Sequence, residues 1–553
     1  MASIEINKHD LEKLVGKRLD SEKLQDNLFD MKLELDRIED ENLIIEVEYD
    51  RADMLSTEGI ARQMKGYFGS ESGLIKYEFK PSKSEVKISE EMKKYRPYAQ
   101  YFIALNVPFD SAAIKQIMQI QEKLHFIYAQ DRTKASIGVY DLDKTSKQFE
   151  YKPTEPEKIS FVPLESKAKM NGRDILQKHP KGAEYAHLLE HMEKYPLLSD
   201  CNGKVLSMPP IINSEDTKVD ENTKNLFVDV TGIDERVVNK ITVILATMLA
   251  ERGAEVRTVK IEYGTETTET PKLEYNEMKL RALDVRRILG LNLSETEIMN
   301  LLKKARYGCE MQSGLINVII PCYRFDVMHP VDLIEDVAIN YGLNNMKPIM
   351  PNVATIGEIH PIEKRTNKFR ELMIGLGFQE TGSFVLSNKE KMTAMTKNLE
   401  RPVELENYSS LEYNCMRNSL ISKILDIFKA NKHRELPQKV FEAGDVVHIT
   451  NKGETKTRTA KNLCAGICSA EAGFTEIKSN VQALLSNAGI KTEYKEIKQG
   501  EEMCFLSGRC AEVYDLKNGK KIGVLGEIHP EILQNFELEN PIALFEIEID
   551  KLL

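Results

Sequence analysis

The chain has 553 residues, of which 41% are hydrophobic and 29% are charged, and it contains no Trp. This length predicts roughly three or four domains, with enough apolar residues for several hydrophobic cores. The formal net charge of −11 excludes a protein that binds nucleic acid over its whole surface. Any contact with RNA must therefore be local, or shared with a more basic partner.

The cysteines and the apolar runs indicate the compartment. The eight cysteines are scattered and none forms a C-x-x-C pair, which is typical of a protein from a reducing compartment. The N-terminal sequence MASIEINKHD lacks the apolar core of a signal peptide. The longest apolar run, residues 241–250, is too short to span a bilayer. We therefore expect a cytoplasmic protein without a membrane segment.

The first part of the chain, residues 1–85, predicts a small α/β domain. Alternating apolar residues indicate strands at 3–6 and 43–49. Ser56 can cap a following helix, because its hydroxyl accepts a hydrogen bond from a free N–H of the first turn. Residues 70–95 are rich in Lys, Glu and Ser, so we expect them to form a solvated connection.

Residues 96–265 alternate between strands and long helices, and this pattern favours a mixed α/β domain. The strands are expected in RTKASIGVYDLD, LFVDVTGID and AEVRTVKIEY, and helices are expected at 111–126, 183–194 and 234–252. Pro209-Pro210 stiffens the backbone just before a polar cluster. Such a cluster can aim hydrogen bonds at a ligand, or it can be a plain turn made by Ser or Thr side chains.

The second of these expected helices contains a pattern used by some zinc peptidases. His187, Glu190 and His191 form H-x-x-E-H. On one helix both imidazoles would share a face, and Glu190 could activate a water. No third ligand is evident nearby, and short patterns arise by chance. A polar helix face is the alternative, and a zinc hydrolase stays as a rival function.

Four carboxylates gather around residues 321–345, PCYRFDVMHPVDLIEDVAINYGLNN. Pro330 suits the first position of a helix over 331–341. Spacings of three and four place three acids on one face of that helix, and a fourth leaves the preceding strand. Such a group needs a cation among its members, and oxygen ligands suit Mg²⁺ or Ca²⁺. Acids in a first turn can instead simply complement the helix dipole. The four are Asp326, Asp332, Glu335 and Asp336.

This stretch resembles the metal-binding helical domain of the phenylalanyl-tRNA synthetase beta subunit family, with its pattern YRxD…HPxDxxEDVAxxYGxNN. A second likeness lies in DRADMLSTEGIAR, which is similar to the family's NRPDLLSVEGLAR, although Asp50 and Ala52 depart from it. A third runs from NYSSLEYN to FEAGDVV and is similar to NPxSxE…LRxSLLxxLLxxLxxN…FExG. The resemblance covers essentially the whole chain, in the archaeal and eukaryotic-type form.

The resemblance implies an α+β multidomain protein. It divides the chain into an N-terminal α/β domain (1–85), a tRNA-editing domain (96–265), a small helical metal-binding domain (270–345) and a class II synthetase-like domain (350–553) whose antiparallel sheet carries helices. Arg417 is not followed closely by Glu, and no Gly-rich stretch ending in Glu-Arg comes after it. The last domain therefore resembles a class II fold without ATP chemistry, with Arg417 structural or at an interface.

The resemblance also implies site residues. Editing means hydrolysis of a mischarged tyrosyl group on tRNA-Phe by a positioned water. The family match selects Leu198, Asn213, Ser214, Asp229 and Thr231 as its lining. Asp229 as a base and Asp229 as the cap of a turn both stay open. Asp326, Asp332, Glu335 and Asp336 would carry Mg²⁺ near the contact with an alpha subunit.

As a whole, the family implies a phenylalanine–tRNA ligase of two alpha and two beta chains that joins phenylalanine to tRNA-Phe using ATP. Activation would belong to the alpha chain. This chain would supply editing, the scaffold and part of the tRNA surface. A non-enzymatic assembly protein that has lost editing is a further rival.

Overall fold

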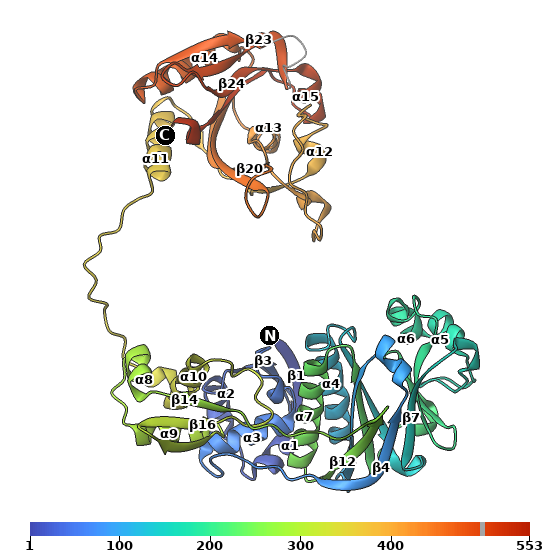
Figure 1. The fold of residues 1–553 in the computed structure, drawn as a ribbon. Helices are drawn as coiled ribbons and strands as arrows, with labels where there is room; N and C mark the ends of the chain where they lie inside the picture. The colour runs from blue at the N-terminus through green and yellow to red at the C-terminus, as the bar shows by residue number, and fades with distance from the viewer. Residues whose placement is uncertain (498–503, 553) are drawn as a thin grey trace. The chain divides into compact units, whose positions relative to one another are not determined.

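The computed structural model describes residues 1–497 and 504–552. It divides into two compact units, Met1–Met350 and Pro351–Leu553, whose elements are labelled in Figure 1. The expected division into four domains stays a prediction. Among the described residues, no helix combines the length and apolarity needed to cross a membrane.

The N-terminal part of the first unit is a three-stranded antiparallel sheet with three helices, and two of the strands lie where the sequence predicts them. Ser56 caps the third helix by accepting a hydrogen bond from the Gly59 N–H, and Gly69 ends it with a φ of +73°. This helix is buried on nearly every side instead of docking through one face. The elements are β1 (Ala2–Asn7), β2 (Leu33–Glu39), β3 (Asn42–Val47), α1 (Lys8–Val15), α2 (Ser21–Phe29) and α3 (Thr57–Phe68).

The largest element of this unit is a ten-stranded sheet of order β10-β9-β8-β7-β4-β12-β5-β11-β6, with β13 paired to β12. β4 runs parallel to β7 and β12, and the other pairs are antiparallel. The strands are β4 (Lys80–Ile88), β5 (Tyr98–Leu105), β6 (Ala135–Asp141), β7 (Gln148–Thr154), β8 (Tyr195–Asp200), β9 (Val205–Met208), β10 (Ile212–Asn213), β11 (Leu226–Gly232), β12 (Glu255–Tyr263) and β13 (Glu266–Thr270).

The solvated connection expected over residues 70–95 is wrong from residue 80 onward, because β4 lies inside the sheet between β7 and β12. Ser84, Val86 and Ile88 are buried, while of the two charged residues between them Lys87 is exposed and Glu85 is half-buried. Composition suggested a linker, but this alternation is that of a strand with one covered face.

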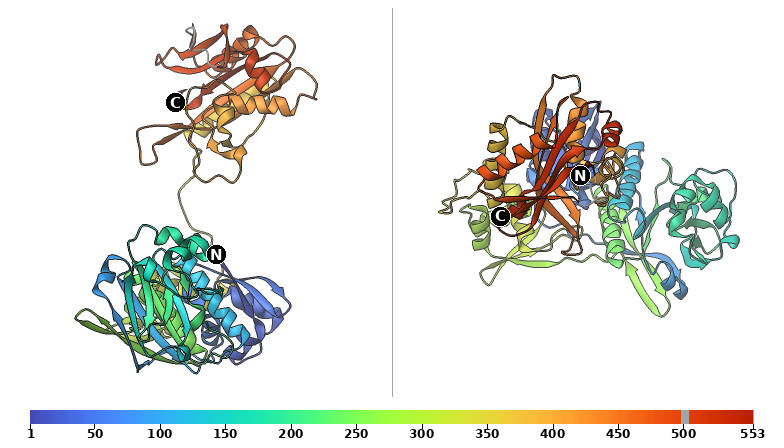
Figure 2. Two further views of the ribbon diagram at one scale, coloured as in Figure 1. Left: turned by 90° about the vertical axis from the view of Figure 1, so that its right-hand side faces the viewer. Right: turned by 90° about the horizontal axis from the view of Figure 1, so that it is seen from above.

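Two long helices cover one face of the sheet. α4 (Ser111–Ile127) and α7 (Glu235–Glu251) lie between the N-terminal sheet and the ten-stranded sheet (Figures 1 and 2). Both helices lie where the sequence predicts them. The short helices α5 (Gly172–Lys178) and α6 (Pro180–Tyr185) follow β7.

Aromatic side chains fill the other face, inside a curl of the sheet. Phe149 of β7 stacks on Phe227 of β11, with ring centroids 4.0 Å apart and planes 8° apart. Tyr140 of β6, an edge strand, is hydrogen-bonded to Ser207 of β9, near the opposite edge. The sheet therefore bends until its two edges meet.

The segment expected to be a small helical domain contains a sheet as well. Its strands β14 (Glu277–Leu280), β15 (Gly308–Gln312) and β16 (Leu315–Ile319) pair in the order β14-β16-β15. Three helices accompany them. Ser294 begins the second through a capping box with Glu297, as the sequence predicts. They are α8 (Ala282–Leu289), α9 (Glu295–Lys304) and α10 (Pro330–Tyr341).

The second unit is a seven-stranded sheet of order β17-β20-β21-β25-β24-β23-β22, antiparallel except for β17 with β20. α11 and α14 contribute to the core on one face, and α13 and α15 to the core on the other. The strands are β17 (Gln379–Glu380), β20 (Gln438–Ile449), β21 (Thr457–Cys468), β22 (Thr492–Glu496), β23 (Phe505–Asp515), β24 (Lys521–Ile528) and β25 (Ile542–Glu548). Beside them are the pair β18 (Leu386–Ser387) and β19 (Cys415–Met416), and α11 (Pro361–Gly375), α12 (Lys389–Met392), α13 (Ile421–Ala430), α14 (Phe474–Asn487) and α15 (Pro530–Asn535).

A buried ion group ties the N-terminal helices to α7. Arg252, just after α7, bonds to Asp10 at 2.8 and 3.2 Å and also to Glu58. All three side chains are less than 8% exposed. Removing one member of such a group leaves buried charges without a partner, which is the costly change.

We expect Arg252→Met to lower the free energy of unfolding by about 3–5 kcal/mol. Arg257→Met is the control, because Arg257 pairs with Glu255 at the surface and such pairs contribute little. Urea unfolding followed by circular dichroism measures both. Equal midpoints for the two variants would contradict the role of Arg252.

Candidate functional site

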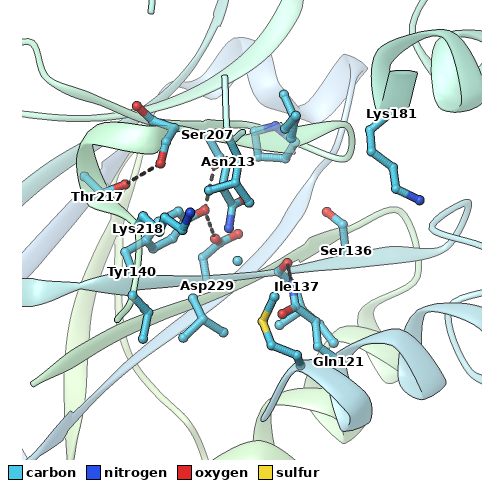
Figure 3. A pocket seen from close by; sticks show the side chains of 18 of the residues that line it. Gln121, Ser136, Ile137, Tyr140, Lys181, Ser207, Asn213, Thr217, Lys218 and Asp229 are labelled. Carbon is cyan, nitrogen blue, oxygen red and sulfur yellow. Dashed lines mark hydrogen bonds between the residues drawn. The ribbon is translucent and has the colours of Figure 1, made fainter. Parts of the chain in front are cut away.

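A cavity of about 380 Å³ opens where the curled sheet meets α4 and the segment around Pro209-Pro210. Its wall is apolar in part, with polar groups at defined places, as in ligand pockets generally. Figure 3 shows side chains from β6, β9, β10 and β11 pointing into this space. The polar residues that line the cavity include Ser136, Tyr140, Ser207, Asn213 and Asp229.

A carboxylate and two hydroxyls meet at the inner end of the cavity. The Tyr140 hydroxyl is hydrogen-bonded to Asp229 Oδ1 and lies 2.7 Å from the Ser207 hydroxyl (Figure 3). Asp229 is 1% exposed and Ser207 is 2% exposed. This group joins three strands, β6, β9 and β11, that are not consecutive in the sequence.

A glycine makes this meeting possible. Gly138 of β6 pairs with Asp229 in the sheet register. A Cβ at this position would lie 2.0 Å from both Asp229 Oδ1 and the Tyr140 hydroxyl oxygen. Any other residue at 138 would therefore force the two groups apart.

The environment of Asp229 changes its ionisation. Burial raises its pKa from 3.8 to about 7, although the hydrogen bond from Tyr140 and the charge of Arg96 act in the opposite direction. A carboxylate poised near neutral pH is suited to accept and release a proton during catalysis. Perturbed carboxylates in cavities are candidates for function.

Two cationic or basic residues shape the wall. His125 Nε2 accepts a hydrogen bond from the Ile137 N–H at 2.8 Å, and burial lowers the pKa of His125 well below its usual range. Arg132 donates to the carbonyl oxygens of Pro210 and Ile211 at 3.2 and 2.8 Å. Arg132 therefore holds the rigid Pro-Pro segment in place at the mouth of the cavity.

The structure brings three of the five editing candidates together. Asn213, Ser214 and Asp229 line the cavity. The Ser214 hydroxyl also accepts from the Asp216 N–H at 3.3 Å, which is the turn-forming role weighed above. Leu198 and Thr231 are fully buried and do not line the cavity.

Both remaining candidates lie close behind the lining. Leu198 pairs with Ser207 in the sheet register. The Thr231 hydroxyl lies 3.3 Å from the hydroxyl of Ser136, a lining residue. Their direct contact with a ligand stays a prediction.

The sequence reasoning missed Tyr140, Ser207 and Gly138. A signal was present, because Ser136, Gly138 and Tyr140 alternate along one strand and must share a face. The sequence does not indicate that this face lies against β9.

The helix expected over residues 183–194 is wrong. α6 ends at Tyr185, a single 3-10 turn covers Ala186–Leu188, and the chain then bends so that Leu189 is buried in the core beneath α5 and α6. His187 and His191 therefore do not share a helix face. Within the described residues, no group of three His, Cys, Asp or Glu is arranged to hold a metal ion.

The acidic cluster of α10 finds its partners within the chain. Arg324 bonds to Asp326 at 2.6 Å and to Asp336 at 2.8 Å. Burial would raise the pKa of Asp326, but the charge of Arg324 and its hydrogen bonds outweigh this and lower it. The guanidinium therefore pairs with both buried members of the cluster.

The two remaining acids point elsewhere. Asp332 accepts from the N–H groups of Met328 and His329 at 2.7 Å each, at the start of α10. Glu335 is paired with Lys32 at 3.0 Å. The four carboxylates do not converge on one point, so as arranged they do not fit a magnesium ion.

Comparisons with known proteins bear on the whole chain. Family models match residues 346–549 (Phenylalanyl tRNA synthetase beta chain CLM domain), 278–343 (tRNA synthetase B5 domain) and 110–261 (B3/4 domain). The phenylalanine–tRNA ligase beta subunit of Methanocaldococcus jannaschii is 40% identical over 100% of both chains. That of Thermococcus sibiricus is 37% identical over 99% of this chain and 98% of its own.

The chain belongs to the phenylalanine–tRNA ligase beta subunit family. A crystal structure of an N-terminal fragment of the phenylalanyl-tRNA synthetase beta subunit from Pyrococcus horikoshii agrees with it at 39% identity and a TM-score of 0.60. The match covers 62% of this chain and 100% of the fragment. Family membership makes the chain a subunit of an aminoacyl-tRNA ligase, and the cavity lies inside the region matched by the B3/4 model.

The raised pKa of Asp229 predicts a pH dependence of stability. Protonated Asp229 stabilises the folded chain. This contribution is complete below the ordinary pKa of 3.8 and is lost as the pH rises through about 7. We expect Asp229→Asn to raise the urea midpoint above that of the wild type at pH 8. The difference should shrink toward pH 5, and a difference independent of pH would contradict the assignment.

All four acids of the cluster have partners within the chain, so we expect the first unit to fold without magnesium. We expect millimolar Mg²⁺ to leave its thermal unfolding midpoint unchanged, because a cation that binds only the folded chain would raise it. Asp332→Asn serves as a comparison variant. A midpoint that rises with Mg²⁺ in the wild type but not in the variant would show that the acids regroup around the ion.

Proposed function

We propose that this chain acts with an alpha subunit, as two alpha and two beta chains, in a cytoplasmic ligase that charges tRNA-Phe with phenylalanine using ATP. Full-length similarity to beta subunits supports this assembly. We further propose that phenylalanine activation belongs to the alpha subunit, and that this chain adds the scaffold and part of the tRNA surface. Its net charge of −11 is compatible with a tRNA surface shared with a more basic partner.

The second unit supports a class II-like fold without ATP chemistry. The Arg417 side chain is 2% exposed and bonds to Glu442 at 2.6 Å and to the Ser383 hydroxyl at 2.8 Å. Both of these bonds are made by Nη1, and Nε donates to the Asp445 carbonyl oxygen at 2.7 Å, so buried partners within the chain hold this side chain. Arg417 is therefore structural.

The cavity of the first unit is proposed as the editing site that hydrolyses tyrosyl-tRNA-Phe. The observation that carries this proposal is the carboxylate of Asp229, with its pKa near 7, at the inner end of a cavity of about 380 Å³. This volume is in the range of small-molecule sites. A polar wall that bonds the tyrosine hydroxyl would reject phenylalanine, because its polar groups would stay unpaired.

The chemistry is the cleavage of an ester. A water held by Asp229 attacks the carbonyl carbon of the tyrosyl ester and passes its proton to the carboxylate. Polar groups of the wall, such as Asn213, stabilise the charge that develops on the carbonyl oxygen. The terminal ribose hydroxyl leaves with a proton, and the products are tyrosine and uncharged tRNA-Phe. No step uses magnesium at the acidic cluster.

The test is the deacylation of tyrosyl-tRNA-Phe by the complex of both subunits. We expect the wild type to release tyrosine and Asp229→Asn to be slower by about a hundredfold or more, the usual worth of a general base. Charging with phenylalanine should be unchanged in the variant, because that site lies in the other subunit. Normal charging without any deacylation by the wild type would favour a chain that has kept assembly and lost editing.

A further inference from the structure

The hydroxyl of Tyr140 contacts side chains from two other strands, and the proposed editing reaction suggests a function for it. We propose that Tyr140 is a positioning residue for hydrolysis, which holds the Asp229 carboxylate so that its second oxygen faces the reacting water. This inference rests on the proposed function. It concerns a residue that touches the base and not the substrate.

The direction of the hydrogen bonds supports this role. An ionised carboxylate has no proton, so the bond between Tyr140 and Asp229 Oδ1 is donated by the phenol. A phenol has one proton, so the 2.7 Å contact with Ser207 is then donated by the serine hydroxyl. The chain of bonds runs from Ser207 to Tyr140 to Asp229. Among the described residues, none donates a hydrogen bond to Asp229 Oδ2.

The surroundings fix the phenol itself. Tyr140 is 1% exposed, and its ring lies 6.1 Å from Phe227 inside the curl. Gly138 leaves the space in which the hydroxyl and Oδ1 meet, since a Cβ there would lie 2.0 Å from both. The carboxylate is thus held from one side by a rigid aromatic group, and rotation about its last bond is restrained.

A second tyrosine provides a matched control. Tyr101 pairs with Asp229 on the other side in the sheet register and stacks on the same Phe227 at 5.7 Å. It is fully buried, but its hydroxyl has no hydrogen-bond partner among the described residues. Removing the hydroxyl of Tyr101 therefore changes the same core without changing the orientation of Asp229.

Several charged or titratable groups face Asp229. Inside the curl they are Arg96, Tyr101, Tyr140 and Tyr151. Arg96 and the bond from Tyr140 favour the ionised carboxylate. Loss of the Tyr140 hydroxyl therefore raises the pKa of Asp229, while Arg96 stays in place. On the cavity side the ionisable groups of the wall include Glu122, His125, Arg132, Glu165, His179 and Lys218.

The reaction step makes the expectation specific. Water adds its oxygen to the tyrosyl carbonyl carbon and its proton goes to Asp229 Oδ2. The bond to the ribose oxygen then breaks as that oxygen takes up the proton from Asp229, which restores the carboxylate. The rate therefore follows the ionised fraction of Asp229 and the direction of Oδ2. Misplacement of a reacting group by a fraction of an ångström lowers the rate steeply.

The experiment compares Tyr140→Phe, Tyr101→Phe and Gly138→Ala in the complex of both subunits. Deacylation of tyrosyl-tRNA-Phe is measured from pH 5.5 to 8.5, after subtraction of spontaneous hydrolysis. We expect Tyr140→Phe to be slower by about tenfold to a hundredfold, with the inflection of its pH profile moved upward. Gly138→Ala should move the inflection in the same direction, because the added methyl separates the two groups without removing either. Tyr101→Phe should keep the wild-type rate and inflection.

Thermal unfolding of each variant, with phenylalanine charging as a second check, shows that the complex is intact. Equal rates and inflections for Tyr140→Phe and Tyr101→Phe would overturn the role of Tyr140 while leaving the editing function standing. Lower rates in both variants with an unchanged inflection would also overturn it, because that pattern is loss of packing. A wild type that does not deacylate at all, with Asp229→Asn indistinguishable from it, would overturn the editing function itself.

Discussion

The stack of Phe149 on Phe227 is the contact on which the site depends. The two rings come from β7 and β11, which are separated in the sheet by β4, β12 and β5. They can touch only if the sheet bends back on itself. Burial of large aromatic surfaces is strongly favourable, so this core holds the curl closed. The bend then brings β6 to β9, and with them Tyr140 to Ser207, while Asp229 reaches Tyr140 from the neighbouring strand β11.

Buried arginines play the corresponding part elsewhere. Arg252 joins α7 to α1 and α3, Arg324 pairs with two acids beside α10, and Arg417 binds Glu442 in the second unit. In each case the chain supplies both signs of charge, so the pair needs no outside ion. Pairs of this kind cost much when broken, because one charge is left in a poorly solvated place. Arg324 in this way holds the two buried acids of the cluster, Asp326 and Asp336.

Local signals in the sequence predicted local structure well. Pro330 begins α10 and Ser56 caps α3, because these preferences act within one turn. The sequence did not predict β4, because its many charged residues suggested a linker. Alternate side chains of this strand are buried, and the charged ones lie between them. The helix predicted over His187 does not form, because the chain bends to bury Leu189 in the core. Helical propensity does not reflect such a tertiary contact.

The centre of the site was beyond the reach of local reasoning. Tyr140 and Asp229 are 89 residues apart and meet because β6 pairs with β11, whereas the contact of Tyr140 with Ser207 follows from the curl of the whole sheet. The family resemblance selected Asp229, Asn213 and Ser214, which line the cavity, and also Leu198 and Thr231, which lie behind it. Resemblance locates a region, but only the packed fold shows which side chain reaches the open space.

The most direct test of the account is a crystal structure of the complex with a tyrosyl-adenosine analogue whose ester is replaced by a stable amide. The account predicts the phenol ring inside the cavity between α4 and the Pro209-Pro210 segment, with the amide carbonyl carbon facing Asp229 Oδ2 across one water. An analogue bound to the second unit, or one whose carbonyl lies away from Asp229, would contradict it.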